Sequence, residues 1–362
     1  MKSITDTNAV QGRLFGFDVQ NHRVITPGGI LLPGLGRAID VETDQYGVSR
    51  AYVARAQGLF NGTISVVNVD PASGSALWHV DDGPLAPGIP YAIRVKAAGS
   101  TVKAYVTSVE CTPGGGLQPT LCEGGGALGP QGGFGEGGME EMMGPPMHCI
   151  DCEGGGSGPW RRIMLSKYDV TDPENIALEC SQVLSWLTFP GDCNSSTIFA
   201  NVGMAFSLDR TKLFVANPDQ DRVDILDLAT DPPNDPILVP VGDEPVDVAV
   251  VQTAGDFSQE RAYVTNRLGQ SVSVLSVATP MLVATIELTA QEPNPPVQPV
   301  AIAALADGTR LFVANNQHGT IKVVNIDTDS AFENTVVRTI GVGPAVKRLV
   351  LLTLPPLPPP PP

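Results

Sequence analysis

The sequence predicts an all-β fold, a β-propeller of four-stranded antiparallel blades, on three observations. One short apolar pattern occurs five times, and each copy is followed by a second alternating segment. The last three copies are 49 residues apart, within the roughly 40 to 50 residues usual for a propeller blade. Glycine and proline, at 39 and 33 of 362 residues, favour short strands joined by turns. An all-helical fold is therefore excluded.

The recurring pattern is expected to form the second strand of each blade. Its copies are RAYVA around Ala51, KAYVTS around Ala104, KLFVAN around Leu213, RAYVTN around Ala262 and RLFVAN around Leu311. Third strands are expected where apolar residues alternate with period two, at 63–70, 162–170, 222–228, 271–277 and 320–327. First strands are expected at 38–41, 91–95, 204–208, 246–250 and 300–304, and fourth strands at 283–288 and 336–340.

The two chain ends are expected to close the ring in one composite blade. Residues 13–19 and 23–26 fit a third and a fourth strand, and residues 345–354 fit a first strand. A propeller must close, because an open ring leaves strand edges unpaired. Six blades are favoured, and a seventh needs further strands near 189–200. The prediction is one domain over 1–354, followed by a proline-rich tail or linker over 355–362 that adopts polyproline II.

A glycine-rich, acidic insertion over 112–158 interrupts the second repeat. It carries thioether, imidazole and thiol groups that a soft metal such as Cu(I) prefers, on Met139, Met142, Met143, Met147, His148, Cys149 and Cys152. The favoured interpretation is nevertheless a surface loop pinned by disulfides, with the methionines as adaptable apolar contacts. A long loop on a rigid ring is expected to contact a partner.

Six cysteines, an even number, fit three disulfides in an oxidising compartment. The candidates are Cys111, Cys122, Cys149, Cys152, Cys180 and Cys193. Pairing neighbours in this order closes the shortest loops, but the connectivity stays open. The chain as given starts without an apolar signal segment, and an extracellular or cell-envelope location is still the expectation.

The charge balance bears on the partners. Thirty-eight acidic residues against 22 basic ones give a net charge of −16, which repels nucleic acid and anionic lipid. No stretch reaches the roughly 18 to 20 apolar residues of a membrane span. The expected partners are other proteins, including copies of the chain itself or cell-surface components.

The repeats resemble the YVTN family of β-propeller repeats, since residues 262–266 spell AYVTN. The resemblance implies the propeller fold over nearly the whole chain outside the insertion and the tail. It implies less about function, because the family includes surface-layer and adhesion-like proteins, and a related seven-bladed architecture carries lactonases. Arg55 replaces the motif asparagine in the first repeat, and the insertion splits the second, so these two blades are expected to be distorted.

First strands line the central channel of a propeller, so Asp40, Arg94, Asp247 and Lys347 are candidates to line it. A structural charge network is favoured there over a site for a polar ligand or cation. The spacing Asn217-x-Asp219-x-Asp221 has the oxygen ligands of a calcium loop, although a polar hairpin turn explains it more simply. No catalytic constellation of known type is found, and neither a cofactor nor a metal is expected.

The leading hypothesis is a non-enzymatic, extracytoplasmic propeller that acts as a rigid interaction scaffold, with the 112–158 loop as its contact element. One alternative is a propeller hydrolase of lactonase type, whose site at the channel mouth includes Asp40 and Asp247. Another is a structural subunit of a surface layer or filament, linked through the proline tail.

Overall fold

A computed structural model describes residues 11–14, 17–18, 23–24, 30–33, 35–57, 61–70, 76–112, 160–188, 202–229, 235–254, 259–289 and 297–343. Within these ranges every regular element is a β-strand. No helix there has the length and apolarity that a membrane span requires. The predicted all-β fold is confirmed.

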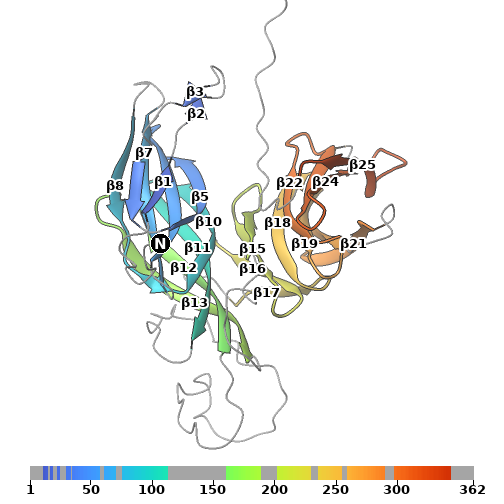
Figure 1. The fold of residues 1–362 in the computed structure, drawn as a ribbon, viewed down its shortest axis with the longest axis horizontal. Coiled ribbons are helices and arrows are strands. Elements are labelled where there is room, and N and C mark those ends of the chain that lie inside the picture. Colours follow the sequence, from blue (N-terminus) through green and yellow to red (C-terminus); the bar gives the residue numbers. More distant parts are fainter. Residues whose placement is uncertain are drawn as a thin grey trace, which may run out of the picture.

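Five antiparallel sheets follow one another along the chain, each built from four consecutive strands (Figure 1). Blade 1 contains β5 (Leu35–Thr43), β6 (Ser49–Gln57), β7 (Asn61–Asp70) and β8 (Ala76–Asp82), with the short β9 (Ala86–Pro87) beside β7. Blade 2 contains β10 (Ile89–Ala98), β11 (Thr101–Thr112), β12 (Trp160–Asp169) and β13 (Ala177–Thr188). Blade 3 contains β14 (Met204–Phe206), β15 (Lys212–Asn217), β16 (Arg222–Asp227) and β17 (Ile237–Pro240).

The last two blades have the same order. Blade 4 contains β18 (Pro245–Gln252), β19 (Glu260–Asn266), β20 (Ser271–Ser276) and β21 (Met281–Glu287). Blade 5 contains β22 (Pro299–Ala304), β23 (Arg310–Asn315), β24 (Thr320–Asn325) and β25 (Thr335–Gly341). In every blade the recurring pattern is the second strand, as predicted.

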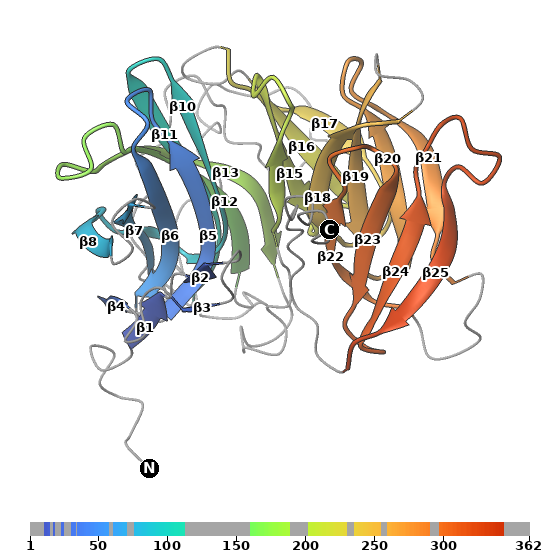
Figure 2. The same cartoon turned by 90° about the horizontal axis from the view of Figure 1, so that it is seen from above.

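The blades pack face to face in chain order, from blue β5–β8 to red β22–β25 in Figure 2. Four separate apolar cores lie between successive blades, and their residues alternate along the strands with period two. Because both faces of an inner blade are covered, consecutive motif residues such as Ala262, Tyr263 and Val264 are all buried. The first strands lie next to one another in the order β5, β10, β14, β18 and β22. These strands form the inner edge of the ring.

The N-terminal strands form two separate two-stranded sheets, and the predicted single strand over 13–19 is divided between them. β1 (Gln11–Leu14) pairs with β4 (Ile30–Pro33), and β2 (Phe17–Asp18) pairs with β3 (Arg23–Val24). Leu32 packs against Ala51, Val53 and Val67 on the outer face of blade 1. The predicted closing strand over 345–354 and the region 189–200 lie outside the described residues, so closure and the six-blade count stay predictions.

The insertion leaves the β11–β12 ladder of blade 2 regular. β11 and β12 pair without a register shift up to Thr112 and Trp160, which flank it. The β6–β7 ladder of blade 1 is equally regular. Of the irregularity expected in these two blades, none occurs in β6–β7 or β11–β12, whereas register shifts occur in β5–β6, β7–β8, β10–β11 and β12–β13. Residues 113–159, with the soft-metal candidates, lie outside the described residues.

Candidate functional site

Charged side chains occur at one height of the inner edge, on blades 1 and 2. Asp40 of β5 pairs with the motif residue Tyr52, and Arg94 of β10 pairs with its counterpart Tyr105. In blades 3, 4 and 5 the residues that pair with the motif aromatic are Ala205, Ala249 and Ala303. The five described blades thus carry Asp, Arg, Ala, Ala and Ala at equivalent positions. A ring of repeats does not need this asymmetry for its fold.

Asp40 lies in an environment suited to proton transfer. Its Oδ2 accepts a hydrogen bond from the Val95 amide of blade 2 at 2.8 Å. Burial raises the pKa of the Asp40 carboxyl above its ordinary value of 3.8, and the nearby charge of Arg94, the backbone amides and the charge of Arg210 partly oppose this. Perturbed carboxyls next to a specific cation are typical of functional sites.

A second pair of charges lies beside Asp40. Arg210, in the turn between β14 and β15, places Nη1 2.7 Å from Oε2 of Glu42 on β5. Glu42 is two residues from Asp40, so both side chains are on the same face of β5. The cluster therefore contains two acids of blade 1, one arginine of blade 2 and one arginine of blade 3.

Asp247 lies at a different height. It pairs with Thr265, two residues beyond the motif Tyr263, and hence closer to the end of the blade that carries the motif asparagine. Its Oδ1 accepts from the Val248 amide at 3.0 Å and its Oδ2 from the Ile302 amide of blade 5 at 3.1 Å. Of the four channel candidates, Asp40 and Arg94 lie at one height on adjacent blades, where the charge of Arg94 acts on Asp40, and Asp247 lies at a different height. Lys347 lies outside the described residues.

Blade 3 leaves room for Asp247 through a glycine. A Cβ on Gly203 would lie 2.2 Å from Asp247 Oδ1, 2.7 Å from Asp247 Cα and 2.9 Å from the Val246 carbonyl oxygen. We expect Gly203→Ala to destabilise the protein by about 1–3 kcal/mol, because two of these contacts involve backbone that cannot rotate away. Chemical denaturation would measure the loss. Gly341→Ala is the matched control, since a Cβ there meets nothing within 4 Å; equal unfolding midpoints for the two variants would contradict the prediction.

The motif residue Asn217 joins blade 3 to blade 2. Asn217 Nδ2 donates to Asp224 Oδ2 at 2.6 Å and to the Leu184 carbonyl of blade 2 at 3.4 Å. Of the other two residues of the calcium-loop candidate, Asp219 accepts through Oδ2 from Ser185 Oγ, and Asp221 accepts through Oδ1 from the Glu244 amide. These bonds join turns and blades, and the choice between a calcium loop and a polar hairpin turn at 217–221 stays a prediction.

A buried ion pair lies between blades 1 and 2. Glu110 of β11 and Arg162 of β12 face each other in the ladder, and Arg162 Nε donates to Glu110 Oε2. Their side chains are 0% and 2% exposed. Burial raises the pKa of Glu110, and the bond and charge of Arg162 oppose that shift. The sequence pattern did not predict this pair, because its partners flank the insertion and the strand register brings them together.

The disulfide candidates and possible metal ligands can be assessed among the described residues. Cys180 is disulfide-bonded, and its partner is not among the residues whose side chains are described. Over the described part of the chain, no group of three or more His, Cys, Asp and Glu side chains is placed to hold a metal ion.

Comparisons with known proteins support a propeller and point to a reaction class. Residues 251–349 match the family model described as lactonase, 7-bladed β-propeller. Among solved structures, the periplasmic gluconolactonase of Pseudomonas aeruginosa superposes with a TM-score of 0.57 at 14% identity, over 93% of this chain and 80% of that one. A protein described as a 6-phosphogluconolactonase from Bacteroides uniformis gives 0.52 at 13% identity, over 91% and 78%. Hydrazine synthase of Kuenenia stuttgartiensis gives 0.53 at 12% identity, over 93% and 82%.

The comparison with curated proteins finds no match. The solved structures, all below 25% identity, establish the β-propeller fold. The lactonase match overturns the prediction that the protein is not an enzyme, and it favours the hydrolase alternative over the interaction scaffold. The prediction rested on the absence of a local catalytic motif, whereas the lactonase family model matches repeat strands that contain no such motif. The comparisons support the propeller but not the YVTN family or a surface-layer role, while the expected location and partners stay predictions.

Proposed function

We propose that the protein is a lactonase-type hydrolase, with Asp40 as the general base and Arg94 as the cation that stabilises the oxyanion. One observation carries this proposal: an acid and a guanidinium occupy one height of the inner edge on two adjacent blades, and the equivalent positions of the other described blades are alanine. The lactonase match covers 251–349, on blades 4 and 5, so it supports the proposal independently of the charged cluster on blades 1 to 3.

Lactone hydrolysis adds one water molecule across the ring ester and yields a hydroxy acid. In the proposed reaction the Asp40 carboxylate accepts a proton from water as the water oxygen attacks the carbonyl carbon. Arg94 donates to the carbonyl oxygen as it becomes negatively charged. When the ring C–O bond breaks, the protonated Asp40 returns its proton to the leaving alkoxide oxygen.

The environment of Asp40 suits this role. A general base works best when its pKa is near the working pH, and burial moves the pKa of Asp40 in that direction. The Val95 amide fixes one carboxylate oxygen. Asp40 and Arg94 are half-buried, so neither is sealed in the core.

The proposal is tested by turnover of γ- and δ-lactones in a pH-stat, with aryl esters and phosphoesters as comparison substrates. The expected result is saturable ring opening whose rate is proportional to the concentration of the full chain and which is faster for lactones than for open-chain esters. Rates equal to the buffer rate for every lactone would overturn the proposal.

A further inference from the structure

The Glu42–Arg210 pair joins two blades that share no core. Blade 1 packs against blade 2, and blade 2 packs against blade 3, in separate apolar clusters. Arg210 nevertheless reaches from the β14–β15 turn of blade 3 to Glu42 on the first strand of blade 1, at 2.7 Å. The pair therefore spans blade 2 at the inner edge of the ring.

The turn that carries Arg210 is firmly held. The Arg210 amide donates to the Ser207 carbonyl at 2.8 Å, and the Asp209 carboxylate accepts from the Ser207 hydroxyl and from the Thr211 amide. The Leu208 amide donates to Glu260 of blade 4 at 2.6 Å. Arg210 itself has a φ of 56°, in the left-handed region that non-glycine residues seldom adopt. Such a conformation persists where the surroundings hold it, and it occurs often at functional sites.

The pair brings a positive charge to the carboxylate of the proposed base. Glu42 and Asp40 are one pleat repeat apart on β5, roughly 6.6 Å along the strand. Arg210 held at Glu42 acts on Asp40 from the side of blade 3, and Arg94 acts on it from blade 2. The Arg210 side chain is 42% exposed, whereas that of Glu42 is 12% exposed. The Glu42 side chain is thus the buried partner of the ion pair, and the Arg210 side chain is the one that solvent can draw away from it.

We infer that Glu42 is a positioning residue that holds the Arg210 guanidinium beside Asp40, so that blade 3 supplies a second cation to the site. The inference rests on the proposed function of Asp40. Among the described residues, the hydrogen-bonded ion pair that holds the Arg210 guanidinium over blade 1 is the one with Glu42, and without it the more exposed guanidinium would be screened by solvent.

A double-mutant cycle read at Asp40 tests the inference in the full chain. ¹³C NMR follows the titration of the Asp40 carboxyl in the wild type, Glu42→Gln, Arg210→Gln and the double variant. Loss of a nearby positive charge raises a carboxyl pKa, so Arg210→Gln is expected to raise that of Asp40. In the Glu42→Gln background the same change is expected to have almost no effect, because the charge has already moved away. An equal shift in both backgrounds would overturn the inference, since Glu42 would then play no part in placing Arg210.

Two controls separate charge from general damage. Arg210→Lys keeps a cation and should restore part of the shift, and Arg338→Gln, on the exposed β25 of blade 5, should leave the Asp40 titration unchanged. In the kcat/KM profile, Arg210→Gln should move the acid limb to higher pH in the wild type and move it little further in Glu42→Gln. Failure of lactone turnover would contradict the proposed function. The NMR cycle would still show whether Glu42 holds Arg210 beside Asp40. An additive cycle with turnover intact would reject the positioning role alone.

Discussion

Asp40→Asn is expected to lower kcat/KM for lactone opening by roughly 10²- to 10⁴-fold, the usual contribution of a positioned general base. The asparagine oxygen can still accept from the Val95 amide, so the link between blades 1 and 2 is kept. Burial disfavours the ionised carboxylate, hence the neutral amide should not lower stability near neutral pH. We therefore expect a loss of activity in the pH-stat assay with an unchanged or higher thermal midpoint.

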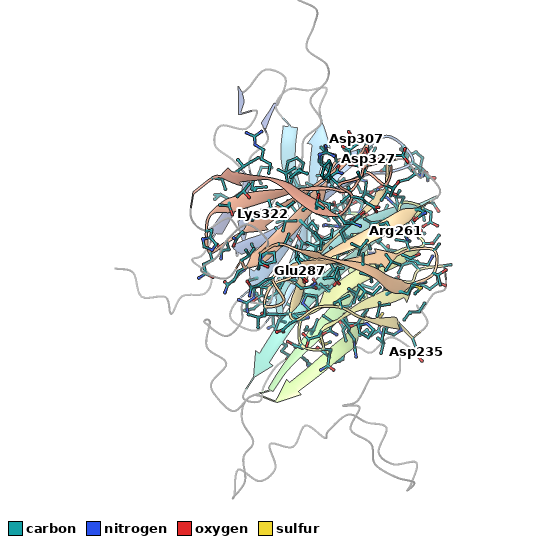
Figure 3. The ribbon with its side chains drawn as sticks, turned by 90° about the vertical axis from the view of Figure 1, so that its right-hand side faces the viewer. Asp235, Arg261, Glu287, Asp307, Lys322 and Asp327 are labelled. Atoms are coloured by element: carbon teal, nitrogen blue, oxygen red, sulfur yellow. The ribbon has the colours of Figure 1, made fainter. Side chains whose placement is uncertain are left out.

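Asp307→Asn is the matched control for this variant. Asp307 lies in the turn between β22 and β23, close to Asp327 at one end of blade 5 (Figure 3). Its carboxylate accepts from the Thr309 amide and hydroxyl and is remote in the chain from the charged cluster. The same chemical change at Asp307 should leave kcat/KM as it is. If Asp40→Asn retained activity equal to that of Asp307→Asn, Asp40 would not be the base.

Arg162→Met is expected to destabilise the fold by about 3–5 kcal/mol, because it leaves the Glu110 carboxyl buried without its cation. Without Arg162 the pKa of Glu110 rises further above its ordinary value of 4.5, so the folded state binds a proton that the unfolded state releases. The protonated form is stable below pH 4.5, and that stability is lost as the pH rises through the folded pKa. Urea midpoints should therefore fall more steeply with pH in Arg162→Met than in the wild type.

The double variant Glu110→Gln, Arg162→Met separates the loss of packing from the stranded charge. It removes both ionised groups, and replacing a buried pair with uncharged groups is often close to neutral. We expect it to recover a large part of the stability lost in Arg162→Met and all of the added pH dependence. If Arg162→Met were as stable as the wild type at pH 8, the Glu110–Arg162 pair would have to be accessible to water.

The repeat period predicted the five described blades because each blade must bury its faces against the next, which forces the same apolar alternation on every copy. The motif strand at Ala262 illustrates this, as both of its faces are covered. The packing of the N-terminal strands on blade 1 could not be predicted from the repeat period. Leu32 meets Ala51 and Val67 through tertiary contacts that follow no sequence period.

The candidate site was predictable in the parts that the strand register fixes. Asp40 and Arg94 were placed on first strands, and Glu42 could have been added from its spacing of two residues on the same strand. Arg210 could not be predicted as part of the site, because it reaches Glu42 from a turn 168 residues away along the chain. The buried pair of Glu110 and Arg162 was hidden for a similar reason, since the insertion separates its partners along the chain.

The most direct measurement compares the acid limb of the wild-type kcat/KM profile with the ¹³C NMR titration of the Asp40 carboxyl. If Asp40 is the base, lactone opening falls as the pH drops through the same pKa that NMR assigns to Asp40, and this pKa lies above the ordinary value of 3.8. Ring opening that continues undiminished while Asp40 becomes protonated would contradict the account.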